Sequence, residues 1–438
     1  MKRIAFYLLL FYSIIKTNAQ SGRDLSLKFL NNLAENKYDS CFACLDTSIN
    51  REITADLLKQ LWESMPRYIG EYKGYSDIKY DKDDTTERTV IRCDFEKMKL
   101  DLKIAHNRYK KIVALLFVPP KNDKAYEPPS YFNPNKFYES KPSVKTGTFE
   151  LPGVLTIPNN VSDPPVAIIL AGSGANDKDE SAGPLKILKD IAVGLAANGV
   201  ASYRYDKRTR KYANDILKHP EVVDLNYEVI DDALSAVELL KNNPVTKNSK
   251  IFIIGHSLGA MCAPLIASKS KTVSGIVMMA GNARPLEDLI VDQFKYLSSL
   301  DTSDQKEKNK QITEIEKQVS IVKDPKKLKT AKASELPFGL ESHYWQSFTD
   351  YDQVKVAKKI KQPILVLNGE RDYQVTLKEF NIWKEQLGAK SKNQFKSYPG
   401  LNHMFIKGEG KPNPQEYEKV GNVQEEVILD IVKWIKEK

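Results

Sequence analysis

The stretch Ile251-Phe-Ile-Ile-Gly-His-Ser-Leu-Gly-Ala260 decides how the rest of the chain is interpreted. Its first four residues are apolar and predict a buried parallel strand, and the small residues after Gly259 predict a helix. A strand, a G-x-S-x-G turn and a helix in this order predict a nucleophile elbow, in which Ser257 has a strained backbone and an exposed Oγ. A Cβ at Gly255 or Gly259 would clash in so sharp a turn.

The pentapeptide alone also occurs by chance as an ordinary turn, so its flanking sequence matters. Strands are expected at residues 149–157, 166–170, 201–205, 251–254, 275–280, 364–367 and 395–398, and helices near residues 185–198, 227–241 and 423–435. Pro152-Gly153 is a hairpin signal within the first of these strands. Such alternation predicts an α/β domain over residues 146–438, with a mainly parallel sheet covered by helices on both faces.

The residues before this domain show a different pattern. Helical periodicity at residues 25–36 and 53–65 is followed by alternating strands at residues 89–95, 98–104 and 112–118. Helices followed by an antiparallel meander predict a small α+β domain over residues 21–120. A segment rich in Pro, Asn, Lys and Tyr predicts a linker at residues 121–145.

Between residues 285 and 361 the alternation of strands and helices stops. Two amphipathic stripes lie there in highly charged sequence, Leu286, Ile290, Phe294 and Leu297 in the first and Ile312, Ile315, Val319 and Val322 in the second. This insertion is a candidate lid, and the alternative is a helical decoration with no gating role. Tyr344 and Trp345 are candidates for the substrate mouth, whereas His343 alone is typical of a surface residue.

Length and composition exclude several classes of protein. A chain of 438 residues suits two domains, and 41% hydrophobic with 28% charged residues is ordinary for a soluble globular protein. The formal net charge of +9 is mild, and no basic patch is interleaved with aromatic residues, so nucleic-acid binding is not expected. The four cysteines form no disulfide framework, and Cys41 and Cys44 lack the further ligands of a metal site. The sequence leaves open whether these two are oxidised.

The first twenty residues have the pattern of a signal peptide. Met1-Lys-Arg3 is a short basic start, residues 4–15 are an apolar run, and a small-residue exit ends at Ala19. The run is too short for a comfortable membrane span. We expect an exported protein, periplasmic or secreted, with no integral membrane segment after removal of residues 1–20.

A serine nucleophile needs a histidine to take its proton and a carboxylate to orient that histidine. In folds with a nucleophile elbow, the three catalytic residues follow one another along the sequence as Ser, then Asp or Glu, then His, and each lies just after a strand. Asp372 ends the loop after the strand at 364–367, and His403 ends the loop after the strand at 395–398. They are therefore the candidate acid and base. Weaker alternatives for the acid are Glu370, Asp350 and Asp352, and His256 is expected to orient the turn.

An ester carbonyl under attack becomes an oxyanion that needs two N–H donors. One is expected from Leu258, which follows the nucleophile. The second is expected from Ser173, because Gly172 and Gly174 let the backbone of this loop approach closely. Phosphate binding is the alternative for a glycine-rich loop, but the Gly-Lys-Ser/Thr of a phosphate-binding loop and the dinucleotide spacing are absent.

Five segments taken together resemble one family: Ala171-Gly-Ser-Gly-Ala-Asn-Asp-Lys-Asp179, Tyr203-Arg-Tyr-Asp-Lys-Arg208, Gly255-His-Ser-Leu-Gly-Ala260 with Ala263-Pro264, Gly369-Glu-Arg-Asp-Tyr-Gln-Val375 and Leu401-Asn-His-Met-Phe405. The combination is similar to the secreted bacterial α/β-hydrolase fold carboxylesterases of the EstD type, from about residue 149 to the C-terminus. That family often carries an N-terminal cystatin- or NTF2-like α+β domain, which residues 21–120 would form.

The resemblance implies an α/β-hydrolase fold with a helical lid insertion. It places Ser257, Asp372 and His403 in the triad positions. It also implies a supporting salt-bridge shell around the oxyanion loop, made of Asp177, Asp179, Arg204, Asp206 and Arg208. Lys178 stands where the family usually has arginine, and Ala260 where it often has glycine. Both changes are expected to narrow the pocket and to leave the triad intact.

The sequence thus predicts an exported serine hydrolase that cleaves carboxylic esters, with short acyl chains, through an acyl-enzyme and without a metal or organic cofactor. A small pocket bounded by the Ser173 loop, Leu258 and Tyr344 or Trp345 favours short acyl groups. The alternatives are a serine peptidase of the same fold and a non-catalytic binding protein. The sequence does not predict the oligomeric state.

Overall fold

The computed structural model describes residues 21–438 except 51–52, 84, 97, 119–124 and 301–304. The predicted signal peptide, residues 1–20, therefore lies outside the described residues. The chain divides into two compact units, residues 1–121 and residues 122–438. None of the helices in the described ranges is long and apolar enough to cross a membrane.

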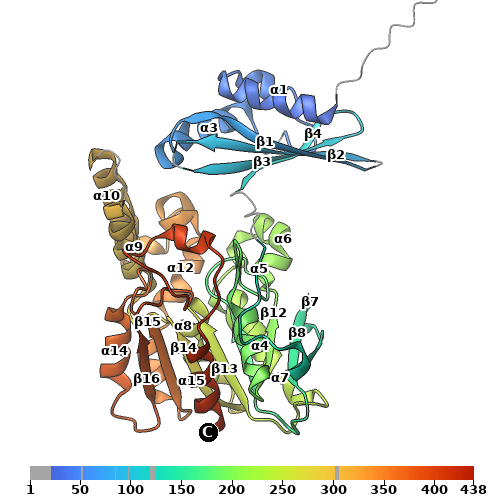
Figure 1. The fold of residues 1–438 in the computed structure, drawn as a ribbon. Coiled ribbons are helices and arrows are strands. Elements are labelled where there is room, and N and C mark those ends of the chain that lie inside the picture. Colours follow the sequence, from blue (N-terminus) through green and yellow to red (C-terminus); the bar gives the residue numbers. More distant parts are fainter. Residues whose placement is uncertain (1–20, 51–52, 84, 97, 119–124, 301–304) are drawn as a thin grey trace, which may run out of the picture. The chain divides into compact units, whose positions relative to one another are not determined.

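Unit 1 consists of helices packed on one face of a four-stranded antiparallel sheet (Figure 1). Its elements are α1 (Gly22–Ala34), α2 (Tyr38–Phe42), α3 (Ala55–Ile69), β1 (Tyr72–Lys82), β2 (Thr86–Phe95), β3 (Lys99–Asn107) and β4 (Ile112–Val118). Ser21 begins α1, because its Oγ accepts a hydrogen bond from the N–H of Asp24. Phe29 and Leu30 of α1 pack against Ile91 and Leu102 of the sheet in a core of the unit's own.

Unit 2 is built on an eight-stranded sheet in the order β16-β15-β14-β13-β9-β12-β8-β5. The strands are β5 (Phe137–Ser140), β8 (Gly153–Pro158), β9 (Val166–Leu170), β12 (Ala201–Tyr205), β13 (Ile251–His256), β14 (Val273–Met279), β15 (Ile364–Gly369) and β16 (Gln394–Tyr398). The run from β12 to β16 is parallel, and β8 pairs antiparallel with both β12 and β5. The predicted mainly parallel sheet is confirmed.

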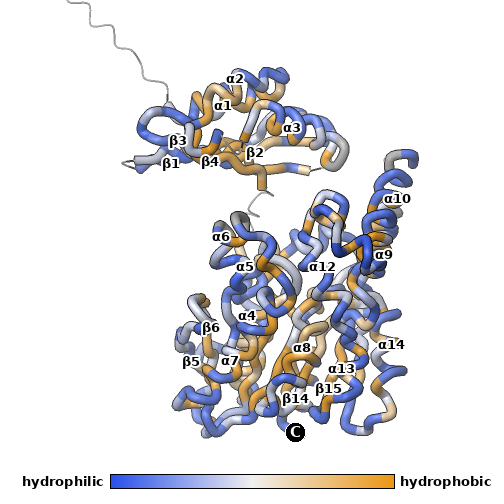
Figure 2. Tube along the Cα trace, turned by 180° about the vertical axis from the view of Figure 1, so that it is seen from behind, coloured by the Kyte–Doolittle hydropathy of each residue, from blue (hydrophilic) through white to orange (hydrophobic). Residues whose placement is uncertain are grey.

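Helices cover both faces of this sheet (Figure 1). On one face lie α4 (Ile187–Ala197) and α15 (Glu425–Lys436), and on the other lie α7 (Asp231–Asn242), α8 (Leu258–Lys269), α13 (Gln353–Lys359) and α14 (Leu377–Leu387). Figure 2 shows the most hydrophobic stretches along the central strands and α8. This burial on both faces explains why the central strands are continuous apolar runs in the sequence.

Shorter elements complete unit 2. They include β6 (Val144–Thr146), β7 (Phe149–Leu151), β10 (Ser181–Ala182), β11 (Leu185–Lys186), α5 (Arg208–Lys211), α6 (Ala213–Lys218) and a π-helical turn (Asn226–Ile230) that leads into α7. Pro152-Gly153 is not the hairpin turn that the sequence predicted, because β7 pairs with β6 and β8 pairs with β12 and β5. The predicted linker at residues 121–145 is also too long, because residues 137–140 form the edge strand β5.

The candidate lid is helical, and its last part belongs to the body of unit 2. Its elements include α9 (Leu286–Leu300), α10 (Gln305–Val322), α11 (Pro325–Leu328) and α12 (Ser342–Thr349). Ile290, Ile315 and Val322 form a separate small core with Trp345. In contrast, Phe348 and the following α13 pack in the main core of the sheet. The insertion with its own core is therefore shorter than the predicted 285–361.

Candidate active site

The turn between β13 and α8 has the predicted geometry. Ser257 has φ 52° and ψ −113°, a region that side chains rarely adopt. A Cβ at Gly255 would lie 2.2 Å from the carbonyl oxygen of Gly259, and a Cβ at Gly259 would lie 2.6 Å from the carbonyl oxygen of Leu170. Both contacts are with backbone atoms, which cannot move aside. Glycine is therefore required at both positions, as the sequence argument stated.

Asp372 and His403 meet at the same edge of the sheet, because they follow the parallel neighbours β15 and β16. Asp372 Oδ2 lies 2.7 Å from His403 Nδ1, and both side chains are buried. Asp372 Oδ1 accepts the N–H groups of Gln374 and Val375, each at 2.8 Å, so the carboxylate is fixed. An Nδ1–H that donates to the carboxylate leaves Nε2 as the nitrogen that can take a proton.

The weaker candidates for the acid lie in other surroundings. Glu370 is exposed and accepts a hydrogen bond from the Ser397 hydroxyl at 2.8 Å. Asp352 caps the N-terminus of α13, and Asp350 accepts from Gln346 at 2.7 Å. None of the three has an ion pair with His403 in the described part of the chain.

Ser173, in the loop after β9, lines the same pocket as Ser257 and Leu258. Within the described residues, the N–H groups of Ser173 and Leu258 make no hydrogen bond. In contrast, the N–H of Gly172 donates to Glu180 Oε1 at 2.8 Å. The Asn176 side chain donates to the carbonyl oxygens of Gly172 and Ser173, at 3.1 and 2.9 Å. The loop is thus held by its own polar contacts while two N–H groups stay available.

A buried ion pair that the sequence analysis missed supports this loop from behind. Lys207 Nζ donates to the carbonyl oxygen of Gly172 at 2.8 Å and to Glu228 Oε1 at 2.6 Å. Glu228 also accepts from the N–H of Gly174 at 3.3 Å and from the Tyr344 hydroxyl at 2.9 Å. Lys207, Glu228 and Tyr344 are all buried. This network ties the oxyanion loop to α12, so the lid region and the donor loop share polar contacts.

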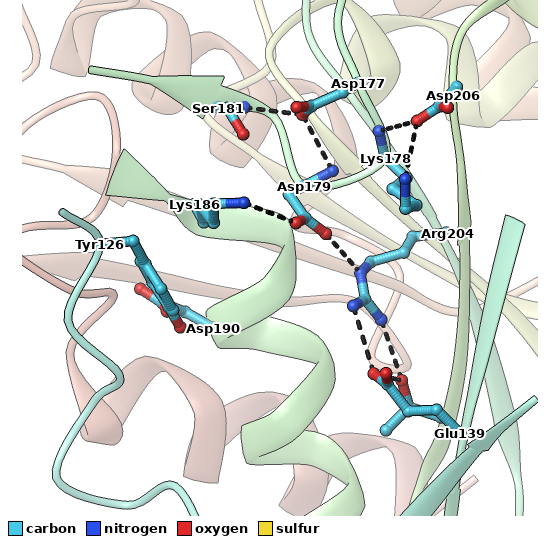
Figure 3. Close-up of polar contacts among 11 residues, drawn as sticks. Tyr126, Glu139, Asp177, Lys178, Asp179, Ser181, Lys186, Asp190, Arg204 and Asp206 are labelled. Atoms are coloured by element: carbon cyan, nitrogen blue, oxygen red, sulfur yellow. Dashed lines mark hydrogen bonds and ion pairs between the residues drawn. The ribbon is translucent and has the colours of Figure 1, made fainter. Parts of the chain in front are cut away.

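The predicted salt-bridge shell exists in part (Figure 3). Arg204 Nε lies 3.0 Å from Asp179 Oδ1, and its other nitrogens bind Thr156 and Glu139. Asp206 pairs with Lys178, whose N–H and Nζ both donate to Oδ1. These contacts fix the segment that follows the oxyanion loop against β12.

Two members of the predicted shell act differently. Asp177 takes part in no ion pair among the described residues, and its Oδ1 instead accepts the N–H groups of Asp179 and Ser181 (Figure 3). Its role is to shape a turn, as a short carboxylate often does. Arg208 pairs with Asp232 of α7 at 2.5 and 3.2 Å, away from the Asp177/Asp179 loop.

A pocket of about 830 Å³ opens beside Ser257. Its lining includes the predicted Ser173, Leu258, Tyr344 and Trp345, together with apolar residues of the lid region: Leu286, Leu289, Ile290, Phe338 and Leu340. The pocket is larger than the small pocket that the sequence predicted, because α9 and residues 338–345 contribute a long apolar wall. No described residue of α10 lines it, and neither Lys178 nor Ala260 does, so these two substitutions do not narrow it.

Comparisons with known proteins indicate the family of this chain. Residues 181–410 match the family described as serine aminopeptidase, S33, and residues 26–115 match a family of unknown function, DUF3887. Over 441 residues the chain is 33% identical to esterase EstD of Thermotoga maritima, with 99% of each chain covered.

Solved structures with a similar fold include two esterases. One is the Pyrococcus furiosus esterase Pf2001, at 17% identity and a TM-score of 0.44, covering 72% of this chain and 98% of that one. The other is Est1E of Butyrivibrio proteoclasticus, at 16% identity and a TM-score of 0.43, covering 68% of this chain and 99% of that one.

Proposed function

The chain belongs to the α/β-hydrolase fold serine esterases, in the family that includes esterase EstD, and from this premise we propose that it cleaves short-chain carboxylic esters through an acyl-enzyme on Ser257. The observation that carries the proposal is the 2.7 Å contact between Asp372 and His403, at the sheet edge that also holds the strained Ser257. A small-molecule ester is thus the expected substrate.

The proposed reaction uses the site residues in turn. Ser257 Oγ attacks the ester carbonyl carbon while His403 Nε2 takes the hydroxyl proton. The N–H groups of Ser173 and Leu258 bind the oxygen that becomes negative, and the alcohol leaves with the proton from His403. His403 then takes a proton from water, which attacks the acyl group and frees Ser257. Asp372 holds His403 in the tautomer that this cycle requires.

Covalent labelling tests the nucleophile directly. A fluorophosphonate probe should modify Ser257 and no other serine, as mapped by peptide mass spectrometry. Prior boiling of the protein is the control, because an activated serine exists only in the folded site. Absence of labelling would favour the non-catalytic binding protein, and labelling of a different serine would move the nucleophile.

The preference for short acyl chains needs its own test, because the pocket has room for more than an acetyl group. The buried aromatic side chains of Tyr344 and Trp345 line this pocket, and the proposal is that they limit the length of the acyl chain. Each methylene that does not fit forfeits about 1 kcal/mol or more of transition-state binding. We expect kcat/KM for p-nitrophenyl acetate and butyrate to exceed that for the palmitate ester by orders of magnitude. A preference for palmitate would overturn this part.

Aminopeptidase activity is the second candidate, since the matching family is described as serine aminopeptidase. Holding a substrate ammonium group requires a carboxylate in the pocket, and Glu341 and Glu228 both line it. Glu228 is already paired with Lys207, so Glu341 is the one to test. An aminopeptidase would hydrolyse aminoacyl p-nitroanilides faster than the acetate ester, and Glu341→Gln would lower only the anilide reaction. We expect the esters to be hydrolysed faster.

Export is proposed from the sequence of residues 1–20 alone. N-terminal sequencing of the protein recovered from its native host should give a first residue near Gln20 or Ser21. A mature chain that still begins at Met1 would contradict it.

A further inference from the structure

His256, the residue before the nucleophile, contacts both halves of the site. It is 1% exposed. Its Nδ1 lies 3.0 Å from Glu180 Oε1, and its Nε2 lies 3.0 Å from the main-chain carbonyl oxygen of His403. The rings of His256 and His403 are 4.7 Å apart between centroids. Because Glu180 also binds the N–H of Gly172, one buried ring joins the oxyanion loop to the loop of the base.

The partners of His256 decide where its protons lie. A carbonyl oxygen can only accept, so Nε2 carries a proton. Glu180 Oε1 already accepts from the N–H of Gly172, so it faces Nδ1 as an acceptor as well, and this contact is satisfied when Nδ1 also carries a proton. Burial by itself lowers the pKa of His256, but the Glu180 carboxylate and the His403 carbonyl outweigh it, and the pKa lies above its ordinary value.

Glu180 shows that this arrangement has a cost. Its backbone has φ 50°, in the left-handed region that disfavours residues with a Cβ. Its second carboxylate oxygen, Oε2, is buried and has no hydrogen-bond partner among the described residues. Unpaired buried acceptors and strained backbone are retained where the surrounding structure requires them, frequently at functional sites.

We propose that His256 is a positioning residue, which Glu180 holds as a permanent imidazolium. In this form His256 fixes the position of His403 and, through its positive charge, disfavours protonation of the His403 ring. This rests on the proposed role of His403 as the base. The charged groups around His256 are Glu180 on its Nδ1 side, and Asp372 with His403 on the side of Nε2. The Lys207–Glu228 pair lies beyond Gly172 and is neutral overall. The imidazolium faces His403, whereas Glu180 lies behind it.

The charge can be removed while the shape of the site is kept. Glu180→Gln removes the counter-ion, so that His256 becomes neutral, and His256→Gln removes the cation itself. At an effective dielectric constant of about 20, a charge near 4.7 Å shifts a proton equilibrium by roughly two and a half pH units, and the opposite charge behind it about halves the effect. We therefore expect the acid limb of the kcat/KM profile to move to higher pH in both variants. The shift should be about one unit in Glu180→Gln, where both charges are lost, and larger in His256→Gln, where the Glu180 carboxylate remains.

The two residues should also behave as a unit. We expect a fall in kcat of about tenfold in each variant with KM within twofold, and no further loss in the double variant, because both changes break the same contact. His343→Gln, at an exposed histidine, is the matched control and should leave both rate and profile unchanged. The inference would be overturned if the variants were active and the acid limb of their kcat/KM profiles lay within roughly 0.2 pH units of the wild-type limb. The proposed function would fail differently, by persistence of activity in Ser257→Ala.

A measurement on the wild-type protein avoids the risk that a variant fails to fold. In ¹⁵N-histidine-labelled protein at pH 8, one histidine should have protons on both ring nitrogens, whereas ordinary histidines are neutral. Its signal should be missing from His256→Gln. A neutral tautomer at His256 under these conditions would overturn the proposal.

Discussion

Ser257 lines the pocket on a backbone with positive φ, and its neighbours are packed closely around this strained turn. Gly255, Gly259 and the end of β9 approach so closely that no side chain fits between them. The N–H of Ser257 donates to the carbonyl oxygen of Met279 at 2.9 Å, which fixes the strained residue to β14. The proposed nucleophile is therefore held by backbone contacts on both sides.

The proposed triad makes the first prediction. Ser257→Ala and His403→Ala should each lower kcat for an ester by roughly a thousand-fold or more, with little change in circular dichroism. Asp372→Asn should lose a comparable amount, because His403 would then be held in the wrong tautomer. Glu370→Gln is the matched control, since Glu370 contacts Ser397 and not His403. A large loss of kcat in Glu370→Gln, with little loss in Asp372→Asn, would assign the role of the acid to Glu370.

Asp190 makes the second prediction, on stability. It is fully buried, and burial raises its pKa to about 6 despite hydrogen bonds from Tyr126, Asn422 and Val423. The unfolded value is near 3.9, so folding takes up a proton between about pH 4 and pH 6, and the contribution of Asp190 to stability falls as pH rises through this window. Between pH 5 and pH 7 the wild type should lose about 1 kcal/mol relative to Asp190→Asn in urea denaturation. A constant difference would show that the carboxylate does not titrate there.

At the scale of elements, strong periodicity was a reliable guide and weak periodicity was not. The central strands of unit 2 and its long helices are present where the sequence predicts them, because each buries one or two apolar faces. Strand β1 escaped prediction, since none of its residues is buried and its sequence is polar. Strand β5 escaped as well, since an edge strand of four residues carries no readable alternation.

The parts of the site differ in the same way. Ser257, Asp372 and His403 follow strands in a fixed order, so local sequence and chain order were enough to propose them, and the structure brings Asp372 and His403 into contact. Lys207 and Glu180 were missed because their partners lie far along the chain: Glu228 is 21 residues from Lys207, and His256 is 76 residues from Glu180. Only the folded sheet brings these pairs together, so the spacing of the residues in the sequence does not predict the contacts.

Helix α10 makes the third prediction, because it packs on the lid core and lines no described part of the pocket. Ile315→Ala should loosen it, since emptying such a buried site costs about 2–4 kcal/mol. Hydrogen exchange across α10 should speed up, while kcat/KM for p-nitrophenyl acetate stays within about threefold. Thr313→Ala, at an exposed position of the same helix, should change neither quantity. A hundredfold loss of activity would show that α10 shapes the site.

At the scale of the whole molecule, the two units each have a core of their own, and every site residue lies in unit 2. The start of unit 2 is held by side chains that precede its first strand. Tyr126 donates to Asp190 at 2.7 Å, and Tyr131 donates to the carbonyl oxygen of Val423 at 2.8 Å. The boundary of the catalytic unit is therefore set by these tyrosines and lies before β5.

Truncation makes the fourth prediction. A chain that begins at Ala125 should keep ordinary esterase activity, because it retains the core of unit 2 and the Tyr126 and Tyr131 contacts. A chain that begins at Tyr131 should be less stable by about 1–3 kcal/mol, since Asp190 loses the Tyr126 hydroxyl and remains buried. Denaturant midpoints and kcat/KM of the two chains provide the comparison. An inactive but folded chain from Ala125 would show that unit 1 helps to build the site.

The Tyr131–Val423 contact also has a consequence for biosynthesis. The two residues are 292 positions apart, so when a ribosome makes the tyrosine its acceptor does not yet exist. Unit 1 can form its own core before unit 2 is made, but the contact that fixes the opening segment of unit 2 forms only after Val423 has been made. The nascent chain therefore matures in two stages: an early one for unit 1, and a late one in which the start of unit 2 is fixed as α15 emerges.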